Sequence, residues 1–145
     1  MKKSIAFLLA TIIILSCNVH RKDKIADDQA AQMEKASKDT TTVELIDSVY
    51  NFGTVTDGEK VEYNFRFKNT GTKPLVVDKT QPGCGCTVAK KPEKPVLPGE
   101  IGFIKIIFNS EYKIGHNEKT IEVTANTKPD FPTLTITGEV IKKKE

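Results

Sequence analysis

Apolar and polar residues alternate through most of the chain after residue 41, which is the period of a half-buried β-strand. The clearest example is KVEYNFRFKN at 60–69, where four apolar side chains alternate with charged or amide side chains. The segment GFIKIIF at 102–108 is more apolar and predicts a strand close to the core. Similar or shorter patterns predict further strands at 42–46, 74–80, 119–126 and 133–141.

Turn-forming residues separate these strands, for example Asp57-Gly58 and Pro98-Gly99. No segment of this region has a helical period, and the short spacing between turns leaves no room for crossover helices. We therefore predict an all-β fold, an Ig-like antiparallel two-sheet β-sandwich of about seven strands. Its core is predicted from the apolar faces of the strands: Tyr63, Phe65, Phe67, Ile104, Ile106, Phe108, Ile121, Val123, Leu134 and Ile136.

The N-terminus has the order of features that is typical of an exported lipoprotein. Lys2 and Lys3 precede an apolar run of 11 residues at 5–15. That run is shorter than the roughly 20 apolar residues of a membrane-spanning helix, but it fits a signal peptide. It ends in Ser16-Cys17, which resembles a lipobox, in which the cysteine receives lipid and becomes the new N-terminus. The alternatives are an uncleaved signal anchor or a cysteine present by chance.

These features divide the chain into four parts. Residues 1–16 are the expected signal peptide, and residues 17–41 are an expected lipid-anchored flexible tether, because they contain no aromatic residue and few large apolar ones. Residues 42–142 form the predicted domain, and 143–145 are a basic tail. We expect the chain in a bacterial cell envelope, attached to the outer membrane through its N-terminal lipid.

Charge excludes one class of partner. The formal net charge is +3, and residues 42–142 contain 13 basic and 13 acidic residues. Such a balanced domain has no basic field for nucleic acid, so we expect no nucleic-acid partner.

A set of short motifs resembles one bacterial envelope family. The motifs are Phe52-Gly53, Asn69-Thr70-Gly71, Cys84-Gly85-Cys86-Thr87 and Pro98-Gly99, and the similar region covers about residues 43–141. This pattern resembles domain of unknown function 1573, which is related to the Hydin-type (ASH) Ig-like modules. The resemblance implies an Ig-like sandwich, often carried by a lipoprotein or secreted chain. It implies no established activity.

Cys84 and Cys86 are the residues of the domain with the most suggestive chemistry, and four interpretations stay open. They can be structural thiols at a tight turn made possible by the flanking glycines, or a disulfide, since exported proteins meet oxidants. They can be soft ligands of a Cu(I)-like metal site together with His116. A catalytic thiol role would favour a C-x-x-C pair at a helix, which is not present here.

The sequence therefore favours a non-enzymatic envelope module that binds a protein or glycan partner or has a structural role, and we expect no cofactor. The alternative is a metal-handling or redox protein that uses Cys84 and Cys86. The loop at 89–100 carries Lys90, Lys91 and Lys94, which are either simply solvated or face an acidic partner.

Two positions fit an acceptor pattern for O-linked glycans. Thr40 and Ser48 each follow an aspartate, in Asp39-Thr40 and Asp47-Ser48, although this pairing is also common by chance.

The lipobox leads to a direct test. Replacing Cys17 by alanine removes the thiol that receives lipid, so Cys17→Ala should abolish metabolic lipid labelling and release the protein from membranes. Labelling that is unchanged in this variant would exclude Cys17 as the lipidated residue.

Overall fold

The computed structural model describes residues 31 and 33–144, and Lys35–Glu145 forms one compact unit. Cys17, the signal peptide and most of the expected tether lie outside the described residues. Residues 33–37 form a short helical turn. In the part of the chain that is described, no helix is long and apolar enough to cross a membrane.

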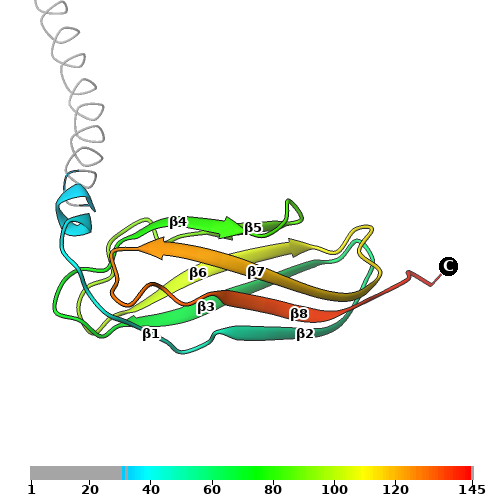
Figure 1. The fold of residues 1–145 in the computed structure, drawn as a ribbon. Helices are drawn as coiled ribbons and strands as arrows, with labels where there is room; N and C mark the ends of the chain where they lie inside the picture. Colours follow the sequence, from blue (N-terminus) through cyan, green and yellow to red (C-terminus); the bar gives the residue numbers. More distant parts are fainter. Residues whose placement is uncertain (1–30, 32, 145) are drawn as a thin grey trace, which may run out of the picture. The chain divides into compact units, whose positions relative to one another are not determined.

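The domain consists of two four-stranded sheets (Figure 1). The first sheet has the order β1-β3-β6-β5, formed by Val43–Leu45, Lys60–Asn69, Ile101–Asn109 and Thr87–Lys90. The second sheet has the order β2-β8-β7-β4, formed by Val49–Thr56, Leu134–Ile141, Gly115–Ala125 and Val77–Pro82. The predicted two-sheet sandwich is confirmed. It has eight strands, and β2 pairs with β8 in parallel, whereas the other pairs are antiparallel as predicted.

Strands β2 and β5 were not predicted, and in β2 a bulge interrupts the alternation. The register between β2 and β8 shifts between Asn51 and Thr54. Gly53 has a φ of 69°, a conformation that favours glycine, and its N–H donates to the Asn51 side chain at 2.8 Å. The bulge turns the Phe52 ring inward over Gly138, where a side chain would clash with that ring. Phe52-Gly53 is therefore a packing element of the second sheet.

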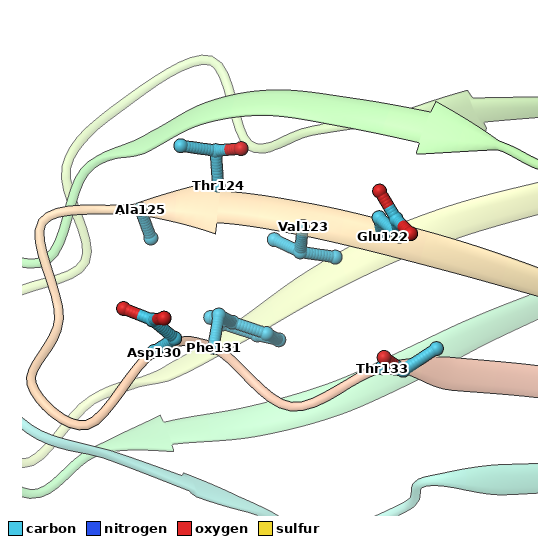
Figure 2. Close-up of a pocket in the computed structure, with 7 residues that line it drawn as sticks. All are labelled: Glu122, Val123, Thr124, Ala125, Asp130, Phe131 and Thr133. Carbon is cyan, nitrogen blue, oxygen red and sulfur yellow. The ribbon is translucent and has the colours of Figure 1, made fainter.

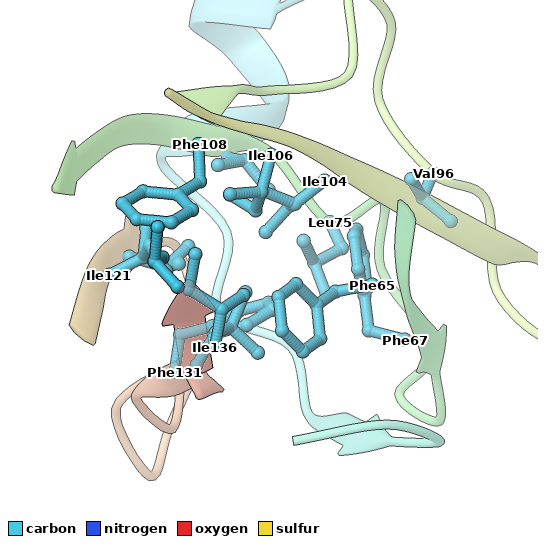
Figure 3. Close-up of a cluster of buried hydrophobic side chains, with 14 residues drawn as sticks. Phe65, Phe67, Leu75, Val96, Ile104, Ile106, Phe108, Ile121, Phe131 and Ile136 are labelled. Carbon is cyan, nitrogen blue, oxygen red and sulfur yellow. The ribbon is translucent and has the colours of Figure 1, made fainter. Parts of the chain in front are cut away.

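The core lies between the two sheets (Figure 3). Nine of the ten predicted core residues are buried, and Tyr63 is half-buried at the margin, where its ring stacks on Tyr50 with centroids 3.8 Å apart. Val96 and Phe131 are buried although they come from loops without strand periodicity. Phe131 meets the Phe67 ring edge to face at 5.2 Å. The buried cluster also contains Leu75, Val77 and Val140, which the list of predicted core residues did not include.

One end of the sandwich is organised around Asn69, the last residue of β3, which is fully buried. Its side-chain oxygen accepts from the Thr41 hydroxyl at 2.8 Å and from the Gly71 N–H at 3.1 Å. Its side-chain nitrogen donates to the carbonyls of Lys73 at 2.8 Å and Val96 at 2.9 Å. Four hydrogen bonds use the full capacity of an asparagine amide, so Asn69 joins three separate chain segments.

Two neighbouring glycines fit this cluster. A side chain on Gly71 would clash with Thr41 and would lie 2.7 Å from the backbone nitrogen of Thr42. Gly99 has a φ of 82° and donates its N–H to the Asn69 carbonyl at 2.8 Å. The motifs Asn69-Thr70-Gly71 and Pro98-Gly99 therefore belong to a single buried arrangement.

The residues just before β1 are attached to the sandwich by Asn126. Its side-chain nitrogen donates to the carbonyls of Ala36 at 3.0 Å and Asp39 at 2.6 Å, and its backbone carbonyl accepts from Thr41 at 3.0 Å. The side-chain oxygen of Asn126 accepts from the Val76 N–H at 2.7 Å. Residues 36–41, the end of the segment assigned to the tether, thus contact the domain.

The chain changes sheets five times, and two of these crossings join an edge strand of one sheet to an edge strand of the other. The first crossing lies between β1 and β2, where Arg66 of β3 binds both carboxylate oxygens of Asp47, at 2.7 and 2.9 Å. This hydrogen-bonded ion pair lowers the pKa of Asp47, because it favours the charged carboxylate. The second edge-to-edge crossing lies between β4 and β5 and contains Cys84 and Cys86.

Removing the Asn69 amide should strongly destabilise the domain. Asn69→Ala leaves two carbonyls, a hydroxyl and an N–H without their partner at a buried site, and one such group costs about 1–3 kcal/mol. We expect a loss of about 3 kcal/mol or more in the free energy of unfolding, measured by urea denaturation. Asn64→Ala is the matched control, because Asn64 is exposed on the same strand. A change of similar size in both variants would contradict the role of Asn69.

Candidate functional site

The Cys84–Cys86 turn connects an edge strand of one sheet to an edge strand of the other. The structure joins the two cysteines in a disulfide, with their Cα atoms 5.4 Å apart. Both side chains are half-buried, and Cys86 packs against the core. The Thr87 hydroxyl lies 3.6 Å from the Cys84 sulfur and 3.9 Å from the Cys86 sulfur.

Hydrogen bonds attach each side of this turn to a different sheet. The Gly83 N–H donates to the Thr120 carbonyl of β7 at 3.0 Å, whereas the Cys86 carbonyl accepts from Asn109 of β6 at 2.9 Å. The Thr80 hydroxyl also donates across the edge to the Ala89 carbonyl at 3.1 Å. The disulfide therefore covalently fixes the crossing from β4 of the second sheet to β5 of the first.

His116 is not part of this turn. It lies on β7 four residues from Thr120, a separation of roughly 13 Å along a strand. Its ring nitrogen Nδ1 is 4.0 Å from the Glu139 carboxylate, and the side chain is exposed. Within the described residues, no group of three or more His, Cys, Asp or Glu side chains is placed to hold a metal ion. The structure thus does not bring together the three residues considered as metal ligands.

The two O-glycan candidates, Thr40 and Ser48, are both exposed. Of the loop lysines, Lys91 donates to the Asp78 carbonyl at 2.6 Å, which ties the start of the loop to β4. Lys90 lies at the end of β5, and Lys94 is exposed in the loop.

The outer face of the first sheet carries three exposed large apolar side chains, which the sequence analysis did not single out. Phe103 is 52% exposed, Ile101 is 49% exposed and Val88 is 52% exposed. Val88 lies opposite Ile107, which is half-buried on the same face. We call these four residues the β6 apolar strip. Strand β5 pairs only with residues 105–108 of β6, so Phe103 and Ile101 lie beyond its end.

Basic side chains border the strip, and one of them, Lys105, interrupts it between Phe103 and Ile107 on the same face of β6. Arg66 lies opposite Phe103, and Lys68 lies opposite Ile101. Lys90 and Lys105 are directly opposite each other, which places two like charges side by side. Lys105 bonds the Glu62 carboxylate at 2.5 Å and thereby lowers the pKa of Glu62, to which the charge of Lys90 also contributes.

The fold and these motifs define an Ig-like two-sheet sandwich. The chain belongs to the family described as "Protein of unknown function (DUF1573)", whose model matches residues 43–140. This finding confirms the family predicted from the motifs. No curated protein matches the chain.

Solved structures show the same fold at low identity. A crystal structure of a protein of unknown function from Porphyromonas gingivalis has a TM-score of 0.62 and 17% identity, and the match covers 71% of this chain and 48% of that one. The chain thus spans about half the length of that protein. The ASH/PapD-like domain 7 of human CEP192 has a TM-score of 0.53 and 15% identity, with 72% and 88% covered. The YadV chaperone has a TM-score of 0.50 and 16% identity, with 71% and 54% covered.

These likenesses establish the fold, not an activity, because a fold hosts many unrelated functions. A family of unknown function with an Ig-like, PapD-like fold is compatible with a non-enzymatic binding or structural module.

The disulfide can be tested by comparing a variant with a reductant. In the chain-entropy relation, closing so small a loop stabilises the domain by only about 1.6 kcal/mol. Cys84→Ser with Cys86→Ser should therefore lower the free energy of unfolding by about 1–2 kcal/mol. Reductant should destabilise the unaltered protein by a similar amount and leave the double variant unchanged. If reductant has no effect on the unaltered protein, the two thiols are not paired in solution.

Proposed function

We propose that this protein is a lipid-anchored, non-enzymatic module of the bacterial cell envelope that binds a protein partner through the β6 apolar strip. The observation that carries this proposal is the exposure of Phe103, Ile101 and Val88 together on one face of a regular sheet. Isolated exposed apolar residues are common, but a group of them with a polar border is typical of an interaction surface.

The chemistry of the border favours an acidic partner. Lys90 and Lys105 repel each other across β5 and β6, and the single Glu62 carboxylate, which is paired directly with Lys105, faces both charges. A carboxylate from a partner would relieve that repulsion, while its apolar groups would cover Phe103. Lys68, opposite Ile101 on one side and Glu44 on the other, also lies on this face.

The attachment of the domain supports a role at a membrane surface. The Ser16-Cys17 lipobox supplies the anchor, and the segment that follows it ends on the sandwich at Asn126. The half-exposed disulfide turn serves the fold in this proposal, because its hydrogen bonds join the two sheets.

Site-specific cross-linking would test the proposed surface. A photoreactive phenylalanine analogue at position 103 should give an adduct in intact envelopes, and the same analogue at Glu118, exposed on the second sheet, should not. The captured protein is identified by mass spectrometry and purified. Phe103→Ser should then weaken its binding to the isolated protein by about tenfold or more, as for a central aromatic contact.

Charge supplies the second arm of this experiment. Lys90→Glu should weaken the same complex and reduce its dependence on salt, whereas Glu118→Lys should leave affinity within about twofold. Equal adducts at positions 103 and 118, or an affinity that Phe103→Ser does not change, would contradict the proposal.

A further inference from the structure

The ladder between β7 and β8 ends before β7 does. The last pair is Ile121 with Leu134, although β7 continues to Ala125. Continued pairing would place Val123 opposite Pro132, which has no backbone N–H to donate. The chain at 126–133 instead bends away from β7, and Phe131 fills the space below it in the core (Figure 2).

The direction of the backbone shows which groups face this opening. The backbone carbonyl of Thr120 accepts from the Gly83 N–H, so the backbone N–H and carbonyl of Thr120 point toward β4. The Thr135 N–H donates to the Ser48 carbonyl, so the backbone groups of Thr135 point toward β2. They point away from Thr120, which lies opposite Thr135 on β7. The backbone N–H and carbonyl groups of successive residues face opposite edges of a strand. Those of Ile121 therefore point toward β8, and those of Val123 point toward the opening.

The opening is a cleft of about 350 Å³, which lies within the size range of ligand sites in proteins. Glu122, Val123, Thr124 and Ala125 of β7 form one wall (Figure 2). Asp130, Phe131 and Thr133 complete the lining. Two carboxylates therefore border the cleft, and none of its lining residues is basic.

We propose that this cleft is a strand-addition site for an extended basic segment of a protein partner. The peptide backbone pairs with the N–H and carbonyl of Val123. Pro132, which would lie opposite Val123, has no N–H to donate to that carbonyl. Alternate peptide side chains point inward toward Phe131 and outward toward Glu122 and Asp130. Small residues suit the inner positions and lysine or arginine suits the outer ones. The site lies on the second sheet and does not depend on the β6 apolar strip.

The probe for this site is a fluorescein-labelled heptapeptide in which lysine alternates with threonine, added to the detergent-solubilised full chain at 150 mM salt. Fluorescence anisotropy measures its binding. The double variant Glu122→Gln with Asp130→Asn should weaken binding by about tenfold or more. The control, Glu118→Gln with Glu139→Gln, removes the same charge from exposed positions outside the cleft and should stay within about twofold.

Backbone pairing is tested separately from charge. The same lysine peptide with every amide nitrogen methylated keeps its charge but cannot donate in a ladder, so it should not bind. The unmethylated peptide should slow hydrogen exchange of the Val123 amide. The proposal is overturned if the lysine peptide does not bind at millimolar concentration, if the methylated peptide binds equally well, or if both double variants lose binding equally.

Discussion

The four hydrogen bonds of the Asn69 side chain are the interaction on which one end of the sandwich depends. A buried amide is stable only when all of its donors and acceptors are paired, so each partner has to be delivered by its own segment. Thr41 comes from the chain before β1, Lys73 from the turn after β3, and Val96 from the loop before β6. Placing Asn69 correctly therefore positions three connections that have no regular structure of their own.

This dependence gives the family motifs a physical reason. Gly71 lets the turn approach Thr41, and Gly99 caps the backbone carbonyl of Asn69. Phe52-Gly53 forms the bulge of β2, and the Cys84–Cys86 turn forms the passage from β4 to β5. These motifs lie at bends, crossings and strand ends, where the alternation of apolar and polar residues does not determine the path of the chain. The residues of these motifs therefore stabilise the irregular connections of the fold.

Residue alternation was sufficient to predict the sandwich and most of its core, because Phe65, Ile104 and Ile121 occupy regular two-residue patterns. It could not predict β2, whose bulge shifts the pattern by a residue, or the burial of Val96 and Phe131, which is decided by tertiary packing. At Cys84 and Cys86 the residue types limited the possible roles to those of thiols. They could not show whether the two thiols are free or joined in a disulfide. The cleft beside Val123 depends on strand pairing, which a single sequence does not display.

The attachment of residues 36–41 has a mechanical consequence. With the N-terminal anchor proposed above, a pulling force would reach the domain along that segment. The hydrogen bonds from Asn126 to Ala36 and Asp39 carry the load first, and the Thr41 contacts with Asn126 and Asn69 carry it next. Only after these bonds break does tension reach β1 and its pairing with β3. The bonds from Asn126 to Ala36 and Asp39 can therefore break and lengthen this segment before the Asn69 cluster is disturbed.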